Sequence, residues 1–391
     1  PQRIVWRRAM DMNDRALREI IIGRGEKNGI ERQDGFVITV ASELMAILCL
    51  AKDEEDFRER VQKIIVAFNV DEEPIRVRDL KISHAIMKLM KDALKPNLVQ
   101  TIENNPVLIH GGPFANIAHG CNSLIALKLS RKLAPIAITE AGFGSDLGAE
   151  KFFDIACRYG EMKPDGVVMV ATLRALKMHG GQLLEKISEE NVEALLKGVN
   201  NLRVHLENIK KFGVPSVVAI NHFASDHQSE IEALEKWCEE KGYVVSFLDG
   251  YLKGGEGAVD LAQKVVKMLD TEPSHYKPLY KLDLPIEEKI EKICKQIYRA
   301  GKVEYSKFAR EQIAKFNQLG YGALPVCMAK TPLSLSDNPE VIGAPEGYTI
   351  TIRELGLSAG AGFVVALTGN ILTMPGLPKV PSAVLMEDLP Y

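Results

Sequence analysis

The chain has 391 residues, of which 46% are hydrophobic and 26% charged, and this is enough for two or three globular domains with substantial cores. Its 49 Lys and Arg residues nearly balance 52 Asp and Glu residues, and the net charge of -3 argues against a nucleic-acid partner. No apolar run approaches the roughly 20 residues that span a bilayer, and no signal-peptide pattern is present. We therefore expect no membrane partner and a cytoplasmic location.

The first quarter of the chain carries helical patterns. ASELMAILCLA repeats apolar residues at helical spacing, DEEDFRERVQKIIVAF opens with acids that suit a helix N-terminus, and KISHAIMKLMKDAL continues the pattern. Residues 9–100 are therefore predicted to be mostly helical, and residues 1–122 to form a helical N-terminal or inserted region.

From residue 106 onward one unit recurs, in which a short apolar run is followed by a Gly-rich or polar loop and then by an amphipathic helix. Apolar runs without alternation are typical of strands that are buried on both faces of a parallel sheet. The fold class predicted is therefore α/β and doubly wound, with mainly parallel sheets and helices on both faces. The predicted strands lie in PVLIH, PIAITE, GVVMVAT, PSVVAIN, VVSFLD, LPVCMAK and GFVVALT.

Further boundaries follow from the same pattern. Helices are predicted at 191–212 and 229–241, a linker at 270–285 and a helical stretch at 286–314. Cuts near Asn122 and Arg203 divide the second part of the chain into an α/β region of residues 123–203 and a C-terminal α/β domain of residues 204–391.

In such folds, ligands bind beyond the carboxyl ends of the strands, and unusual residues gather there in this chain. The first such loop is HGGPFANIAHG, with His110, Gly111, Gly112 and Asn116, whose glycines permit close approach of a backbone to an anion. His119 lies about nine residues after His110 with no carboxylate nearby, which fits a metal site poorly, so we expect no metal site.

The next loop, EAGFGSD, holds an aromatic residue between two glycines. Phe143 precedes Gly144 at a position where a core would not need a large ring. A turn with a helix N-cap at Ser145 or Asp146 explains the same residues. A turn of this kind and an aromatic side chain at a binding site can occur together.

A basic cluster follows the next strand, in VATLRALKMHGG. Arg174 and Lys177 are three residues apart, on one face if a helical turn follows, and His179 precedes two glycines. A guanidinium and an ammonium that face a crevice can hold phosphate or carboxylate. The alternative is the solvated start of a helix, in which the basic side chains merely face water.

Two further loops bring aromatic side chains to strand ends. Phe223 lies in NHFASD, and Tyr251 lies in DGYLKGGEG before Lys253 and a glycine cluster. Two rings on neighbouring strand ends can clamp a flat heterocycle, although either ring alone would more often serve packing. From the residues alone, we expect an α/β protein that binds a flat aromatic ligand and an anion.

Six cysteines, none of them in C-x-x-C spacing, are scattered along the chain. This pattern is typical of buried thiols in a reducing compartment rather than of a disulfide framework or a zinc site. They are Cys49, Cys121, Cys157, Cys238, Cys294 and Cys327.

VATLRALKMHGG closely resembles the signature of the formate-tetrahydrofolate ligase family. The resemblance continues in order through DMNDRALR, KDALKPNLVQT, HGGPFANIAHG, TEAGFGSDLGAEKFFDI, KGGEG, LPVCMAKTPLSLS and SAGAGFVVALTGNILTMPGLPK. It implies a core like that of P-loop NTPases and the ATP-dependent joining of formate to N10 of tetrahydrofolate through formyl phosphate. The substrates implied are formate, tetrahydrofolate and ATP with Mg²⁺, the assembly implied is a homotetramer, and a monovalent cation is left open.

The resemblance also implies residue roles. Phe223 and Tyr251 would sandwich the pterin ring, Phe247 would line the pocket, and Phe143 would lie near the crevice that pterin and nucleotide share. Family members often have Pro where this chain has Ala224, and Trp at the position of Tyr251. Arg174, Lys177 and His179 would be the catalytic cluster on the phosphate side of the crevice. His110, Gly111, Gly112, Asn116 and Gly144 would belong to the nucleotide side.

The sequence G-x-x-x-x-G-K-[ST], which family members use to bind the ATP phosphates, is absent from this chain. We therefore expect the full protein to be longer, with this loop nearer its N-terminus, and the 391-residue chain to be inactive by itself. The alternative is a non-catalytic folate-binding or assembly module.

Overall fold

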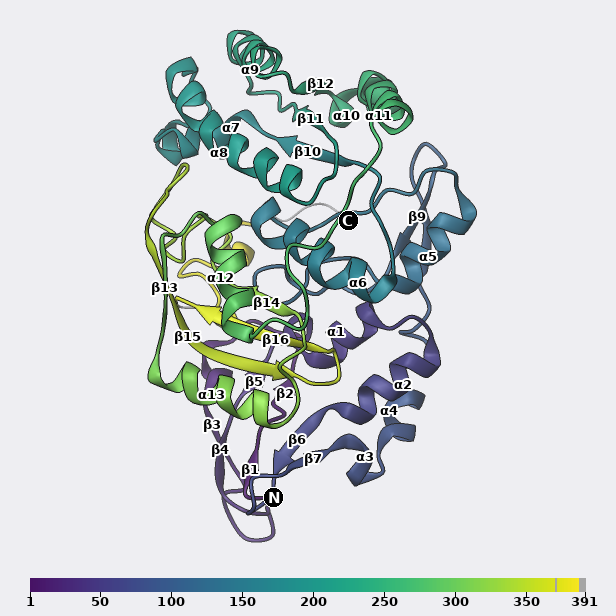
Figure 1. Cartoon of the computed structure of the whole chain (residues 1–391), viewed down its shortest axis with the longest axis vertical. Helices are drawn as coiled ribbons and strands as arrows, with labels where there is room; N and C mark the ends of the chain where they lie inside the picture. Colours follow the sequence, from purple (N-terminus) through teal and green to yellow (C-terminus); the bar gives the residue numbers. More distant parts are fainter. Residues whose placement is uncertain (370, 387–391) are drawn as a thin grey trace.

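Three parallel strands form the sheet that carries most of the predicted site. In the computed structural model, which describes residues 1–369 and 371–386, the order is β10 (Val167–Ala171), β11 (Ser216–Asn221) and β12 (Val244–Leu248) (Figure 1). Helices α8 (Val192–Lys211) and α9 (Gln228–Glu240) share a core with Val218 and Ile220 of β11. Helix α11 (Val259–Thr271) packs against β11 and β12, and the intervening residues Val217 and Ala219 are also fully buried. The three strands and their helices confirm the predicted parallel α/β unit.

A second, mixed sheet forms the middle of the molecule. Its order is β13 (Lys302–Tyr305), β15 (Thr349–Ser358), β16 (Phe363–Thr368) and β14 (Val326–Ala329), with β15 and β16 antiparallel and the outer pairs parallel. Helices α12 (Ile286–Gln296) and α13 (Lys307–Gln318) pack on this sheet through the largest apolar core. A separate core joins Cys327 and Phe363 to helix α1 (Glu43–Leu50), so the sheet is covered by helices of two distant parts of the sequence.

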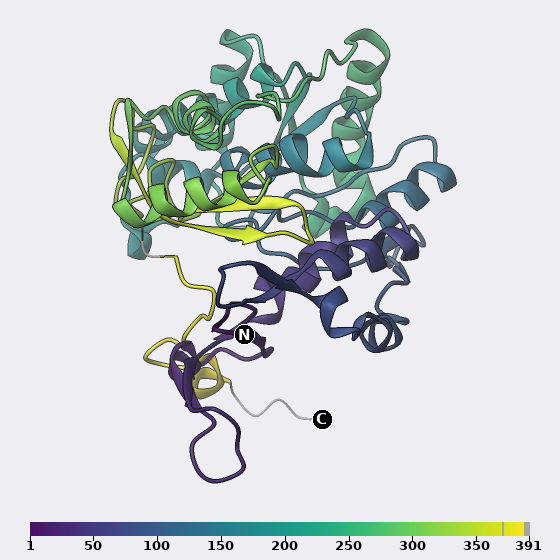
Figure 2. The ribbon, with the colours of Figure 1, turned by 60° about the horizontal axis from the view of Figure 1, so that its bottom comes forward.

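The first 42 residues contain no α-helix, so the prediction of a mostly helical N-terminal region is partly wrong. Short strands and turns occupy this segment because β-branched runs such as Ile20–Ile22 are separated by glycines with positive φ, among them Gly23 and Gly29. The hairpin of β3 (Ile20–Ile22) and β4 (Arg32–Asp34) extends away from the body beside the C-terminal segment (Figure 2). The other strands of the first 76 residues are β1 (Arg3–Ile4), β2 (Arg8–Ala9), β5 (Phe36–Val37), β6 (Ile65–Phe68) and β7 (Pro74–Arg76).

The helices predicted after residue 42 are present. Helix α1 is followed by α2 (Glu54–Lys63), α3 (Val77–Leu80) and α4 (Ser83–Met90), and the Asp53 side chain caps α2 as its acidic start predicted. Single 3-10 turns lie at Arg15–Arg18, Thr39–Ala41, Leu184–Lys186, Gly254–Ala258 and Ser382–Leu385.

Two segments that were predicted to be strands of a parallel sheet are not part of one in the structure. Pro106–Ile109 is the strand β9, but it pairs antiparallel with β8 (Asn97–Gln100) in a hairpin. Residues 135–139 form no strand, and Ile138 is 86% exposed, because no described strand lies alongside to take up the backbone hydrogen bonds. After them come two π-helical turns (Ser145–Ala149 and Phe152–Ala156) and α6 (Cys157–Gly160).

The prediction of a continuous helical stretch at 286–314 is wrong for residues 297–306, which separate two helices. Helix α12 ends at Gln296, Arg299 takes a positive φ, and Lys302–Tyr305 leaves the helix to pair with β15. Pairing with an existing strand outweighs the local helical pattern there. The predicted helices at 191–212 and 229–241 are confirmed as α8 and α9.

The division of the chain into 1–122, 123–203 and 204–391 stays a prediction. Arg203 lies within α8, and the sheet of β10, β11 and β12 takes strands from both sides of that residue. The six cysteines are free and buried, as predicted. Within the described residues, no helix has the length and apolar character needed to cross a lipid bilayer.

Candidate active site

The carboxyl ends of β10, β11 and β12 bring three of the predicted loops to one edge of the sheet, because the three strands are parallel. After β10, the Thr172 hydroxyl accepts a hydrogen bond from the Ala175 N–H and caps α7 (Leu173–His179). After β11 comes the loop of Phe223, and after β12 comes the short helix α10 (Gly250–Lys253), which carries Tyr251. The structure therefore places the predicted aromatic pair and the basic cluster on neighbouring elements.

Arg174 and Phe223 are in direct contact. The guanidinium carbon lies 5.0 Å from the centroid of the Phe223 ring, and an Nη of Arg174 donates to the Ser225 hydroxyl at 2.9 Å. Phe223 is 39% exposed although it stacks on a cation, so part of its ring surface remains in contact with solvent. This contact joins the basic cluster after β10 to the aromatic loop after β11.

The other predicted aromatic residues differ in burial. Tyr251 is 92% exposed, so packing does not explain its ring. Phe247, in β12, is half-buried and lies with its ring centroid 5.0 Å from that of His222. Ala224 is exposed next to Phe223. The rings of Phe223 and Tyr251 thus belong to segments that follow adjacent strands, and Phe247 belongs to the second of these strands.

A polar contact that sequence reasoning missed ties these two loops together. His222 donates from Nδ1 to Asp249 at 3.0 Å, and the Lys253 ammonium lies 3.3 Å from the other carboxylate oxygen. The hydrogen bond from His222 and the charge of Lys253 hold the pKa of Asp249 below its ordinary value. The position of Asp249 directly after a buried strand was the available signal for it.

Lys177 points away from solvent. Its ammonium lies 2.9 Å from a Glu230 carboxylate oxygen and donates to the Glu189 carbonyl, and both charged side chains are almost completely buried. The same Glu230 accepts from the Asn191 N–H at the start of α8. Lys177 therefore joins α7, the helix that carries Arg174, to α9, and its predicted catalytic role stays a prediction.

His179 lies at the end of α7. Its Nδ1 accepts a hydrogen bond from the Gly343 N–H at 3.1 Å, and burial lowers its pKa, with the charge of His205 acting in the same direction. A Cβ on Gly180 would lie 1.8 Å from the Ala194 carbonyl oxygen, so this glycine allows α7 to approach α8. The glycine predicted to give the backbone conformational freedom here instead allows α7 and α8 to pack closely at Gly180.

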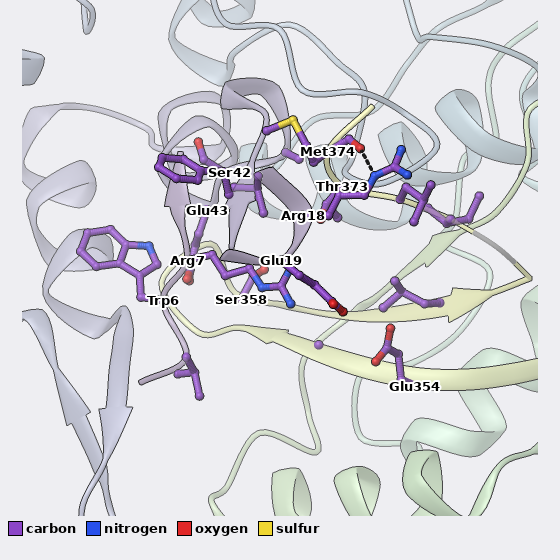
Figure 3. Close-up of a pocket in the computed structure, with 18 of the residues that line it drawn as sticks. Trp6, Arg7, Arg18, Glu19, Ser42, Glu43, Glu354, Ser358, Thr373 and Met374 are labelled. Carbon is purple, nitrogen blue, oxygen red and sulfur yellow. Dashed lines mark hydrogen bonds between the residues drawn. The ribbon is translucent and has the colours of Figure 1, made fainter. Parts of the chain in front are cut away.

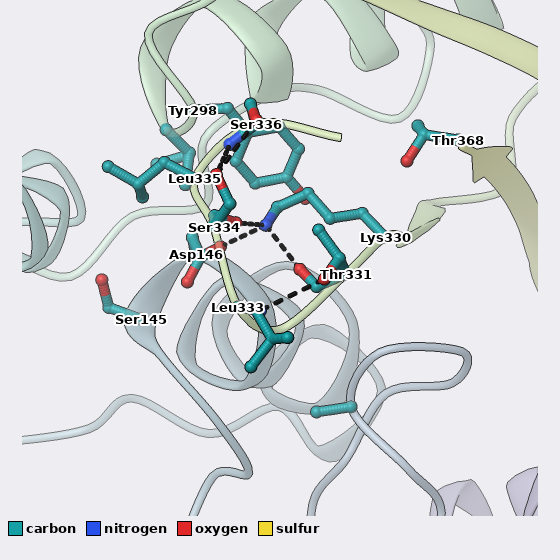
Figure 4. A network of polar contacts seen from close by, with 12 residues as sticks. Ser145, Asp146, Tyr298, Lys330, Thr331, Leu333, Ser334, Leu335, Ser336 and Thr368 are labelled. Atoms are coloured by element: carbon teal, nitrogen blue, oxygen red, sulfur yellow. Dashed lines mark hydrogen bonds and ion pairs between the residues drawn. The ribbon is translucent and has the colours of Figure 1, made fainter. Parts of the chain in front are cut away.

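A buried ion pair supports the second predicted loop (Figure 4). Lys330, fully buried, lies 2.8 Å from Asp146 and donates to the carbonyl groups of Thr331 and Ser334. Burial by itself would raise the pKa of Asp146, but the charges of Lys330 and His205 and the hydrogen bond from Lys330 together hold the pKa below its ordinary value. The Ser145 hydroxyl bonds to Nδ1 of His205 at 2.8 Å. Both candidate N-caps of this loop are thus engaged with other elements.

The predicted nucleotide-side residues of this loop precede the ion pair. Phe143 has a φ of 61° and is more than half exposed. A Cβ on Gly144 would lie 2.5 Å from Asp146 and 2.9 Å from the His205 ring, so only glycine fits there. The loop therefore projects Phe143 from a tightly packed base.

Most of the polar groups described in the loop HGGPFANIAHG form contacts with other parts of the chain. Both ring nitrogens of His110 are engaged, with the Ser123 hydroxyl at 2.7 Å and the Ala93 carbonyl at 2.6 Å. Gly111 has a φ of 70°, and a Cβ there would overlap the Cys49 sulfur. Gly112 faces open space.

Within the same loop, the Asn116 carbonyl accepts from the Lys330 N–H, which links this loop to the ion pair of Figure 4. The Asn116 side-chain oxygen is buried without a hydrogen-bond partner. His119 is fully buried, and burial, followed by the charge of Lys151, lowers its pKa to about 3. Among the described residues, no group of three or more His, Cys, Asp or Glu side chains could hold a metal ion.

A large cavity, of about 1120 Å³, lies between the N-terminal segment and the second sheet (Figure 3). Arg7, Arg15 and Arg18 line it, and Arg18 donates to the Met374 carbonyl at 2.8 Å. Burial raises the pKa of Glu43, also in the lining, to about 7, although hydrogen bonds from the Gly360 and Ala361 N–H groups oppose this rise. Sequence reasoning assigned no role here, but two of the arginines lie in DMNDRALR, a segment that carries the resemblance.

A smaller pocket of about 170 Å³ shares Ser42 and Glu43 with this cavity and is also lined by Ile117 and Ala118. The smaller pocket therefore borders HGGPFANIAHG, while the Arg174 and Phe223 contact lies at the other sheet. The predicted site residues thus fall into two groups, one at each sheet.

A family model described as formate-tetrahydrofolate ligase matches residues 1–388 of this chain. The match includes every loop described above and the cavity between the N-terminal segment and the second sheet. Since it covers nearly the whole chain, the resemblance seen in the sequence is confirmed. The family's reaction is the ATP-dependent joining of formate to tetrahydrofolate, and its substrates are these three small molecules. The chain belongs to the formate-tetrahydrofolate ligase family.

Proposed function

We propose that the carboxyl edge of β10, β11 and β12 binds the pterin ring of tetrahydrofolate beside the reacting formyl group. The contact of Arg174 with Phe223 carries this proposal. Phe223 and Tyr251 offer two exposed rings for a flat heterocycle, and we expect Phe247 and Ala224 to line the space between them. N10 lies next to the pterin, so the acyl donor must lie close to the pterin wall.

The chemistry that this arrangement suits has two steps. A formate oxygen attacks the γ-phosphorus of ATP, and ADP leaves with formyl phosphate as the product. N10 then attacks the formyl carbon, the bond from that carbon to the phosphate oxygen breaks, and N10 loses its proton to give 10-formyltetrahydrofolate. Both transition states carry anionic charge, which a fixed guanidinium stabilises. Arg174 is the cation in contact with the proposed pterin wall, and we assign it that role.

The other predicted residues would act around this centre. Lys177 and His179 would hold α7 in place, through Glu230 and Gly343 respectively. The loops of His110, Gly111, Gly112 and Asn116 and of Phe143 and Gly144 would form the nucleotide side, and their link through Lys330 favours one shared surface. Mg²⁺ would enter with ATP as part of that substrate. The arginines around the large cavity are a second candidate surface for an anion.

The test is a pair of titrations and an assay. Tetrahydrofolate and ATP-Mg are each titrated into the purified protein, and 10-formyltetrahydrofolate is measured after addition of formate, in this chain and in a version extended toward its N-terminus. Product formation supports the ligase. Folate binding without turnover in either version would favour the alternative, a folate-binding or assembly module. The same experiment tests the inactivity expected of the 391-residue chain, and light scattering and cell fractionation test the homotetramer and the cytoplasmic location.

A further inference from the structure

The tip of one hairpin contacts the glycine loop that follows Tyr251. Strands β8 and β9 are joined by residues 101–105, and Glu103 at this tip accepts a hydrogen bond from the Gly255 N–H at 2.6 Å. Positions for a Cβ on Gly254 and Gly255 lie 2.3 Å and 2.6 Å from the two Glu103 carboxylate oxygens. The sequence KGGEG thus lacks side chains at the two residues where the Glu103 carboxylate lies.

The hairpin tip is itself well fixed. Asn104 has a φ of 66° and donates from its backbone to the Thr101 carbonyl at 2.9 Å, while the Thr101 N–H donates to the Asn105 carbonyl at the same distance. The side chain of Gln100 donates to that of Asn104 at 3.0 Å. A tip closed by these bonds can hold Glu103 in one place.

The loop is also fixed at its other end. Asp249 donates from its backbone to the Gly257 carbonyl at 3.1 Å, accepts from the Lys253 N–H, and binds His222 through its side chain. Tyr251 lies between the two fixed points and is itself almost fully exposed, so its own packing contributes little to its position.

We propose that Glu103 is a positioning residue for the folate site. Through its hydrogen bond to Gly255, Glu103 restrains the loop that carries Tyr251 and so sets the gap between the rings of Tyr251 and Phe223. This inference rests on the proposed function. A carboxylate that accepts a backbone N–H makes a stronger bond than a neutral acceptor does. When that bond is lost, the loop samples other positions, and the ligand binds only the fraction of molecules in which the gap is correct.

The test uses Glu103→Ala and Glu103→Gln in the full 391-residue chain, with Glu256→Ala as the control for loss of a negative charge on the same loop. Tetrahydrofolate affinity is measured by calorimetry, and amide hydrogen exchange is followed in residues 249–258 without ligand. For Glu103→Ala we expect faster exchange and a Kd raised about tenfold, with an unchanged Tm. Glu103→Gln keeps a neutral acceptor that makes a weaker bond, so it should raise the Kd by less than Glu103→Ala does. Glu256→Ala should stay within about twofold of the wild type.

Each other outcome overturns the inference. If Glu103→Ala matches the wild type in exchange, the bond does not restrain the loop. If exchange rises while the Kd is unchanged, or if Glu256→Ala weakens binding as much, Glu103 does not set the gap. If the wild type binds no tetrahydrofolate, the proposed function falls as well, whereas binding by the wild type with no effect of Glu103→Ala removes only this inference.

Discussion

Lys177 and Glu230 form an ion pair at 2.9 Å from which solvent is almost completely excluded. The pair joins α7 to α9, and Glu230 also accepts a hydrogen bond from Asn191 at the start of α8. Three helices therefore meet at these two charges, one turn of helix away from Arg174. The relationship gives Lys177 a structural task that its place in a basic cluster did not suggest.

Replacing Lys177 by Met should destabilise the protein by about 3–5 kcal/mol, because the Glu230 carboxylate would remain buried without its partner. The double variant Lys177→Met with Glu230→Leu should recover most of this loss. Urea unfolding followed by circular dichroism gives the values. Lys236→Met, in the exposed pair with Glu240, is the control and should change stability by less than about 1 kcal/mol. A Lys177→Met variant as stable as this control would contradict the anchoring role.

Phe223→Ala should weaken tetrahydrofolate binding about fivefold, since one face contact with a flat ring is worth on the order of 1 kcal/mol. The ring is 39% exposed, so the Tm should change little. Calorimetric titration and thermal unfolding measure the two effects, and Phe223→Tyr, which keeps the ring, should bind as the wild type does. Equal losses of affinity and stability would mean that the ring is part of the core.

Arg174→Lys should lower kcat/KM by about tenfold and Arg174→Ala by more, because an ammonium keeps the charge but not the planar fork that stacks and bonds in two directions. The fold should persist, as Arg174 is only half-buried. The assay of 10-formyltetrahydrofolate, in whichever version of the protein shows turnover, measures the effect. Lys197→Ala, an exposed charge on α8, is the matched control. Wild-type rates in Arg174→Ala would support the alternative of a solvated helix start.

Glu43 should make stability depend on pH. Its pKa rises from an ordinary value of 4.5 to about 7 on folding, so the folded state binds the proton more tightly. The contribution of Glu43 is therefore fully favourable below pH 4.5 and is lost as the pH rises through about 7, by up to about 3 kcal/mol. Glu43→Gln keeps the acceptor for Gly360 and removes the titration.

The measurement for Glu43 is the free energy of unfolding of both proteins between pH 4.5 and pH 8. The variant should gain stability relative to the wild type across this range. A difference between them that stays constant with pH would show that Glu43 does not titrate in this way.

Much of the architecture around the site follows from local patterns. The apolar runs of β10, β11 and β12 and the amphipathic helices α8 and α9 lie where periodicity predicts them, because burial on both faces of a strand and on one face of a helix leaves a regular spacing. The exposed rings of Phe223 and Tyr251 also follow, since each comes directly after such a strand.

Other features depended on partners that are distant in the sequence. Residues 135–139 have the composition of a strand but no strand to pair with among the described residues, whereas residues 302–305 leave a helical pattern because β15 lies beside them. Strand formation needs a second strand for its backbone hydrogen bonds, and periodicity in one segment does not report whether that strand is present.

The sequence by itself determined the family, the order of the loops and the kinds of side chain they carry. Only the tertiary structure decided what those side chains do, because each contact depends on a residue far along the chain. Lys177 forms an ion pair with Glu230, Gly180 packs against α8, and the Gly255 N–H donates to Glu103. Of the predicted basic cluster, Arg174 alone contacts an exposed aromatic ring. Charge and glycine content are properties of a segment, whereas burial and pairing are properties of the folded chain.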